Sequence, residues 1–263
     1  MVVKTIDNWL LVLGLLHLIL FVMSMFLFIP KKIFKTTLPE YNQIFVTHLK
    51  YLLIIFGVVA LHLIEVNMLD PYFTNIVGVD FANNLQMLED GVVYWFSQNW
   101  IPALASFFVV IYIVVYPFTL WFSPLYFILT DDKKAMETLA YGLVLLYAIA
   151  LPFYLFFPVT NVYTFYGAES ALEAVIPNVE HFFYSTTTSN NCLPSLHVAM
   201  TFLIAKSVYV TKNKKYTYFS YFCAVLVIFS VIYLAIHWIT DVLCGIILAF
   251  SVFYLQNRFI REE

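Results

Sequence analysis

Residues 194–241 read PSLHVAMTFLIAKSVYVTKNKKYTYFSYFCAVLVIFSVIYLAIHWITD, and this stretch decides how the chain must fold. It contains two apolar segments, 194–210 and 216–235, joined by a short turn rich in lysine. As helices, both are close to the length that crosses a bilayer. A hairpin of two such helices returns the chain to the face it left. The sequence therefore predicts that His197 and His237 lie side by side at one membrane face.

The composition favours an integral membrane protein. Of the 263 residues, 63% are hydrophobic and 11% are charged, whereas soluble domains have about 25% charged residues. The apolar segments predict an all-α polytopic helix bundle of about seven spans. The third segment stays apolar to Thr130 through Pro117 and Pro124, which predicts a kinked span followed by an interfacial stretch. The segments are 9–29, 46–68, 100–122, 138–158, 194–210, 216–235 and 238–256.

Basic residues alternate between the connecting loops. Lysines follow the first and third spans and fill the turn between the fifth and sixth, and arginines lie near the C-terminus. The loops 69–99 and 159–193 carry acidic residues without Lys or Arg, and Lys4 is the one exception to the alternation. Because basic loops stay in the cytoplasm, we expect the N-terminus outside and both histidines at the outer face, in the plasma membrane.

Both ends of the hairpin have local chemistry of their own. Pro194 suits the first turn of a helix, so the amides that follow it would be free to bind an anion. His237 and Asp241 are four residues apart and share one face of a helix. A carboxylate in that position can accept one ring proton and leave the other ring nitrogen free to attack.

Other polar residues indicate no competing function. The three cysteines show neither metal-ligand spacing nor a disulfide framework. No basic cluster with interleaved aromatic residues suggests nucleic-acid binding. A transporter would need ionisable residues at the bilayer midplane and broken helices in paired halves, and neither pattern is clear. His62 and Glu65, in the second span, either line a headgroup pocket or pair with each other.

In these motifs the chain resembles the type 2 phosphatidic acid phosphatase superfamily. The superfamily signature combines Lys-x6-Arg-Pro, Pro-Ser-Gly-His and Ser-Arg-x5-His-x3-Asp. Pro-Ser-Leu-His at 194–197 corresponds to the second element, and Ser230, His237 and Asp241 correspond to the third. Leucine in place of glycine looks more like the branch that contains inositol phosphorylceramide synthase. The motifs cover about the last third of the chain. They imply a phosphatase-like membrane domain of six helices at 46–263, preceded by an N-terminal span and cytoplasmic loop at 1–45.

The resemblance also implies roles for the matched residues. His237 would be the nucleophile that takes the phosphoryl group, Asp241 would orient it, and His197 would protonate the leaving oxygen. Ser195 and the adjacent amides, including that of Leu196, would hold the phosphate oxygens. Asn191, just upstream of the motif, is expected to donate a further hydrogen bond to the phosphate.

The implied reaction needs no metal or other cofactor. Its substrate would be a membrane lipid phosphate or pyrophosphate, which reacts through a phosphohistidine intermediate. If water resolves the intermediate, the protein is a lipid phosphatase. If a lipid or polyol alcohol resolves it, the protein is a headgroup transferase, and the sequence leaves both open.

The chain departs from the superfamily pattern where basic residues are expected. Val231 stands in the arginine position of the third motif, the stretch 158–163 lacks Lys and Arg, and no arginine precedes Arg258. Losing one such stabilising group typically costs ~2.7–4 kcal/mol of transition-state binding. Either other groups replace them or the chain has a different role. The candidate replacements are the helix terminus, a protonated His197 or His181, Asn190, Asn191, Tyr163 and a bound cation. It would then be a catalytically weak or inactive relative that binds a lipid phosphate or scaffolds a partner.

Overall fold

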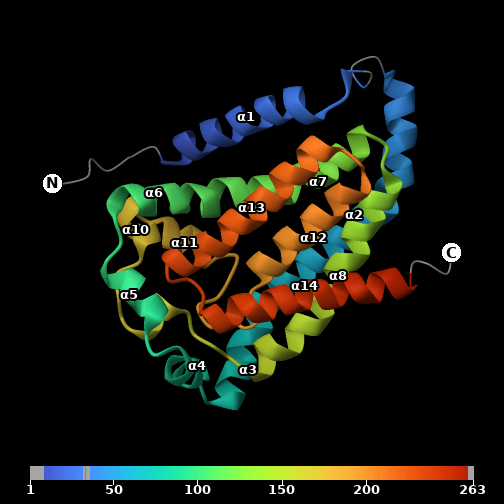
Figure 1. The fold of residues 1–263 in the computed structure, drawn as a ribbon. Helices are drawn as coiled ribbons and strands as arrows, with labels where there is room; N and C mark the ends of the chain where they lie inside the picture. The colour runs from blue at the N-terminus through green and yellow to red at the C-terminus, as the bar shows by residue number, and fades with distance from the viewer. Residues whose placement is uncertain (1–8, 32, 34–35, 260–263) are drawn as a thin grey trace.

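The computed structural model describes residues 9–31, 33 and 36–259, and these are arranged almost entirely as helices (Figure 1). Two of the elements, η2 and η3, are π-helical turns. No strand occurs among the described residues, so the predicted all-α class is confirmed. The elements are α1 (Trp9–Phe28), α2 (Leu38–Ile64), η2 (Glu65–Leu69), α3 (Asp70–Val77), α4 (Ala82–Glu89), α5 (Val92–Gln98), α6 (Pro102–Val110), η3 (Ile111–Val115), α7 (Tyr116–Leu129), α8 (Lys133–Phe156), α9 (Val162–Phe165), α10 (Ala171–Val175), α11 (Val179–Phe183), α12 (Leu196–Val210), α13 (Lys214–Tyr233) and α14 (Ile239–Phe259).

Six helices in the described part of the chain are long and apolar enough to cross a membrane. The remaining predicted segment is α12, an apolar helix of 15 residues. The predicted polytopic bundle is therefore confirmed, with some boundaries displaced. The second span begins at Leu38 rather than at 46, and it continues through η2 and α3 to Val77.

The third predicted span is one continuous apolar helix, Pro102–Leu129, with the π-helical turn η3 inside it. The expected kinked span with an interfacial stretch after it stays a prediction. Pro117 lies two residues after the end of η3, and the Tyr116 amide bonds the carbonyl of Ile111, five residues earlier. The wider π-helical turn interrupts the regular ladder at the point where the proline ring would otherwise disturb it.

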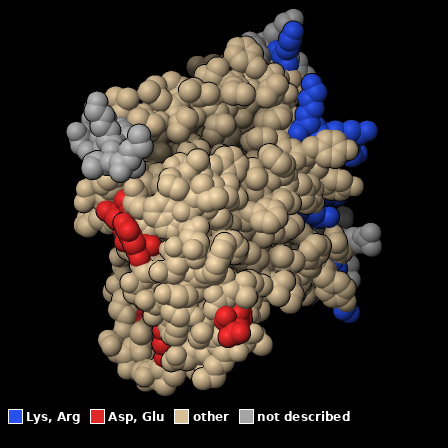
Figure 2. Space-filling model, turned by 60° about the vertical axis from the view of Figure 1, so that its left-hand side comes forward, with Lys and Arg blue, Asp and Glu red and all other residues tan. Residues whose placement is uncertain are grey.

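On the face that Figure 2 shows, Lys and Arg lie on one side of the molecule and Asp and Glu on the other. The separation is incomplete elsewhere, because Glu40 and Asp131 line one cavity with Lys133. The gathering of Lys and Arg at one side agrees with the positive-inside pattern on which the predicted outer N-terminus rests. Part of that prediction rests on residues outside the described ranges, namely Lys4, Lys32, Lys35 and Arg261.

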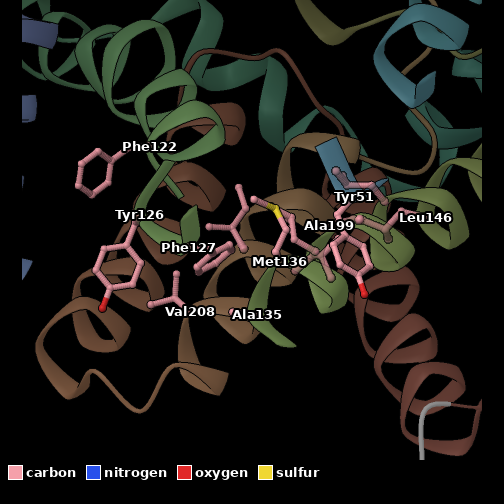
Figure 3. Packing of buried hydrophobic residues seen from close by; sticks show 14 of the residues in the cluster. Tyr51, Phe122, Tyr126, Phe127, Ala135, Met136, Leu146, Ala199 and Val208 are labelled. Carbon is pink, nitrogen blue, oxygen red and sulfur yellow. The ribbon is translucent and has the colours of Figure 1, made fainter. Parts of the chain in front are cut away.

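The helix α12 lies at the centre of the bundle and packs against α8, α13 and α14 (Figure 1). Ala199 and Val208 of α12 meet Phe127, Ala135 and Met136 in the buried core (Figure 3). Because protein surrounds it, α12 holds its ends in fixed positions relative to the three neighbouring helices.

Two glycines allow the close approach of helices to α12 and its start. A Cβ at Gly142 of α8 would lie 2.4 Å from Leu203 Cδ1, and one at Gly245 of α14 would lie 2.5 Å from the carbonyl oxygen of Ser195. The second contact brings the second turn of α14 beside the start of α12, where the Ser195 amide also donates to the Asp241 carbonyl oxygen. The start of α12 and the start of α14 lie next to the predicted motif residues.

Candidate active site

The two histidines predicted to converge are in contact. His197 lies in the first turn of α12, and His237 lies in the turn between α13 and α14. Nδ1 of His197 is 3.2 Å from Nε2 of His237. The residues between them form the predicted hairpin of α12 and α13, which pack along each other.

Asp241 holds the opposite edge of the His237 ring. Its Oδ2 lies 3.3 Å from Nδ1 of His237 and accepts a hydrogen bond from the Trp238 amide at 2.9 Å. The Asp241 side chain is fully buried, and its Oδ1 has no hydrogen-bond partner. Asp241 takes this position because it lies in the first turn of α14, where a carboxylate can bond free amides.

A residue outside the recognised motifs extends this chain of contacts. The hydroxyl oxygen of Tyr112 lies 2.8 Å from Nε2 of His197, and Tyr112 is buried on the π-helical turn η3. The rings of Tyr112 and Tyr116 both pack on His197, with centroid distances of 5.0 and 5.1 Å. Such turns are frequent at functional sites. Nothing in the local sequence marks Tyr112, which is one of 19 tyrosines in an aromatic-rich chain.

With Asp241 ionised and both rings neutral, the contacts fit one arrangement of protons. Tyr112 donates to Nε2 of His197, which places the ring proton of His197 on Nδ1. That N–H donates to Nε2 of His237, and the proton of His237 then lies on Nδ1, where Asp241 accepts it. These positions are inferred from the heavy-atom network. The lone pair of His237 Nε2 therefore faces His197.

Burial keeps His237 neutral. Removal of the ring from water lowers the pKa of His237 to about 3, because a charged imidazolium is poorly solvated there. Burial also raises the pKa of the adjacent Cys192 thiol well above its usual value, so the thiol keeps its proton. Cys192, His237 and Asp241 offer ligand atoms within 4.8 Å of one another, which is spacing that a metal ion could use. A metal would require the Cys192 thiolate, which burial disfavours.

The predicted phosphate ligand Ser195 is already bonded within the protein. Its Oγ caps α12 by accepting from the Val198 amide at 3.5 Å, and its own amide donates to the Asp241 carbonyl oxygen at 3.0 Å. Because Ser195 is the cap, Pro194 precedes the helix rather than occupying its first turn. Leu196 begins α12, where first-turn amides have no partner within the helix.

Asn191 is engaged with a buried acid. Its Nδ2 donates to Oε1 of Glu65 at 2.5 Å. Glu65 is fully buried on η2, accepts from the Tyr147 hydroxyl at 3.2 Å and lies 3.4 Å from Nδ1 of His62. His62 and Glu65 thus pair, as one of the two sequence interpretations proposed. Glu65 also holds the loop that precedes α12.

The stretch 158–163, where basic residues are expected, has polar but uncharged side chains at Thr160, Asn161 and Tyr163. In the stretch 158–163, the Thr160 carbonyl oxygen accepts from Nε1 of Trp238 at 2.9 Å, which ties this stretch to the turn that carries His237. Asn161 and Tyr163 both bond the hydroxyl of Tyr184. Within the described residues, no ion pair joins a Lys or Arg to these groups.

An acidic side chain also caps the start of α14. Glu89 accepts hydrogen bonds from the Ile239 amide at 3.0 Å and from the Thr240 amide at 2.7 Å. Helix N-termini attract anions, and here the anion comes from the protein itself. These two amides, close to His237, are consequently occupied.

Comparison with known proteins gives one match. The family model described as PAP2 superfamily matches residues 77–255, which is more than half of the chain and includes Tyr112, His197, His237 and Asp241. No curated protein and no solved structure matches the chain.

Proposed function

The chain belongs to the PAP2 superfamily, and we propose that it is an integral membrane phosphoric ester hydrolase or phosphotransferase that acts on a lipid phosphate at the outer membrane face. The observation that carries this proposal is the continuous contact chain from Tyr112 through His197 and His237 to Asp241. A neutral, oriented imidazole is the form of histidine that can act as a nucleophile.

The first step forms a bond from His237 Nε2 to phosphorus and breaks the bond from phosphorus to the leaving oxygen. Binding of the anionic phosphate favours a second proton on His197, and His197 gives that proton to the departing alcohol. Phosphorylated His237 carries positive charge on its ring, which the Asp241 carboxylate balances. Water or an alcohol then attacks phosphorus, gives its proton to His197 and restores His237.

Substrate must separate the two rings. At 3.2 Å, His197 Nδ1 and His237 Nε2 leave no room for a phosphate between them. His197 is partly exposed whereas His237 is buried, so the proposed substrate enters on the His197 side. Leu196, Ser195 and Asn191 are the proposed phosphate donors, and Asn191 would exchange its contact with Glu65 for one with the phosphate.

A second candidate is a relative that binds a lipid phosphate without turning it over. The observations that favour it are the neutral groups at the expected basic positions and the carboxylates of Glu65 and Glu89 near the motif residues. Both carboxylates oppose the binding of an anion unless a cation or a proton compensates.

The test is to incubate purified protein with a membrane lipid extract, with and without divalent cations, and to follow released phosphate and new headgroup species by mass spectrometry. His237→Ala is the test variant, and His17→Ala in α1 is the matched control. Activity in the wild type and in the control but not in His237→Ala would support the enzyme, and the products would separate hydrolysis from transfer. Folded wild-type protein that retains labelled lipid phosphate without turnover would favour the binding role.

A further inference from the structure

A second polar site lies at the end of the bundle opposite the histidines. A cavity of about 820 Å³ opens between α8, α12, α13 and α14. His197 lies in the first turn of α12, and Lys206 and Val210, which line the cavity, lie in its last turns. The cavity is thus separate from the candidate active site.

Four lysines give the cavity its charge. Lys134, Lys206, Lys212 and Lys214 all line it, and they come from three helices and the turn between two of them. The ion pairs among the described residues all involve histidine, so none of these ammonium groups has a carboxylate within 4.0 Å there. Glu137, on the same helix as Lys134, accepts instead from the Tyr51 hydroxyl. Four cations around one cavity with no described counter-ion favour an anionic ligand.

A buried amide gives an independent sign of a ligand. Gln256 is 5% exposed and lines the cavity. Its Nε2 donates to the Thr138 carbonyl oxygen at 2.7 Å, which fixes the orientation of the amide, and its Oε1 has no hydrogen-bond partner. A buried acceptor without a donor is unfavourable. A hydroxyl or N–H group on a ligand would satisfy it after a small movement of the side chain, because Oε1 is itself covered in this structure.

The surroundings of the cavity match the edge of a bilayer. Tyr209 and Tyr218 line the cavity and are exposed, as is typical of aromatic residues at the headgroup level. Along α13 and α14, Phe222, Phe250 and Tyr254 are also exposed. These helix faces are suited to contact with acyl chains beside a headgroup.

We propose that this cavity binds the headgroup of an anionic phospholipid. The lysines neutralise the phosphate, Gln256 Oε1 accepts a hydrogen bond from a headgroup hydroxyl, and the acyl chains lie along α13 and α14. Basic pockets between membrane helices are known to recognise lipid headgroups in this way. The proposal does not depend on the function proposed for the histidines.

The test is a titration of purified protein with phosphatidylinositol, with bound lipid counted by native mass spectrometry. The test variant is Lys134→Gln combined with Lys212→Gln. The matched control is Lys133→Gln, since Lys133 lies next to Lys134 but lines a different cavity together with Glu40 and Asp131. We expect binding to weaken by about fivefold per lysine removed and to be unchanged in the control. Equal binding by the double variant and the wild type would overturn the proposal.

Two further ligands separate lipid from other anions. Soluble inositol phosphate carries the same headgroup chemistry without acyl chains, and we expect it to bind much more weakly. Comparable affinity would mean that the site serves a soluble anion and would overturn the lipid assignment.

Phosphatidylmethanol carries a phosphate charge but no hydroxyl, so the wild type should prefer phosphatidylinositol and Gln256→Met should lose that preference. No preference in the wild type would remove the role of Gln256.

Discussion

The hydroxyl oxygen of Tyr112 lies 2.8 Å from Nε2 of His197, although 85 residues separate the two in sequence. In the proposed proton arrangement the Tyr112 hydroxyl donates to Nε2 of His197, which leaves the ring proton on Nδ1, next to His237. Tyr112 is therefore a positioning residue for the proposed reaction. It acts through His197 rather than on the substrate.

Replacing Tyr112 by phenylalanine should lower kcat with little change in KM. Hydrogen bonds to groups that become charged contribute ~1.5–3 kcal/mol, so the expected loss is about tenfold to a hundredfold. The pH dependence of kcat should also shift, since His197 no longer has a fixed tautomer. Both effects are measured as released phosphate across a pH series.

Tyr116→Phe is the matched control for this variant. Tyr116 packs on the same ring of His197 but directs its hydroxyl to Sδ of Met200 at 3.8 Å. It should keep wild-type kcat and pH profile. If the two variants behaved alike, Tyr112 would have only a packing role.

The stability of the protein should fall in acid partly through His237. Burial lowers the pKa of His237 to about 3, whereas an unfolded chain has the ordinary value of about 6.5. Between these values the unfolded chain takes up a proton that the folded chain cannot hold. The contribution of neutral His237 to the free energy of unfolding is therefore fully present above about pH 6.5. It is lost as the pH falls toward about 3.

Thermal unfolding in detergent across this pH range would measure the effect. His237→Gln should show a shallower fall of Tm with decreasing pH than the wild type, and His17→Gln should keep the wild-type slope. Parallel curves for all three proteins would mean that His237 is solvated and titrates normally.

Gly245 should not tolerate a methyl group. A Cβ at Gly245 would lie 2.5 Å from the backbone oxygen of Ser195, which cannot move aside as a flexible side chain would. Gly245→Ala should therefore displace α14 from the start of α12, destabilise the protein by ~1–3 kcal/mol and lower activity. Gly57 of α2 has nothing within 4 Å of the same added atom, so Gly57→Ala should be neutral or slightly stabilising. Unfolding curves of the two variants make the comparison, and equal curves would contradict the close packing.

The helix bundle and the meeting of the histidines could be predicted from the sequence because both depend on segment length. Two apolar segments that follow each other across a bilayer must return to the same face, which brought His197 and His237 together. The pairing of Asp241 with His237 follows from their spacing on a helix. These inferences need no knowledge of which side chains pack where.

The partners of the motif residues could not be predicted, because they come from distant segments and from irregular turns. Tyr112 and Glu65 both lie on π-helical turns, and a π-helical turn rotates later residues away from the face expected of a regular helix. Asn191 was assigned to phosphate from its place near the motif, yet the structure bonds it to Glu65. Pro194 matched a helix start, but Ser195 is the better capping residue and displaced it.

The last prediction concerns the orientation of the protein in the membrane, because this orientation decides on which membrane face the proposed substrate lies. The acidic loop that contains Glu169 should face outward, and the basic turn that contains Lys215 should face the cytoplasm. Both side chains are exposed, so single cysteines placed there can report their side through a membrane-impermeant maleimide. The native cysteines are buried or partly buried and are replaced by serine or alanine in the background. Intact cells should label Glu169→Cys, and Lys215→Cys should react only after permeabilisation. The reverse pattern would put the histidines on the cytoplasmic side, and the proposed substrate would then be a lipid of the inner leaflet.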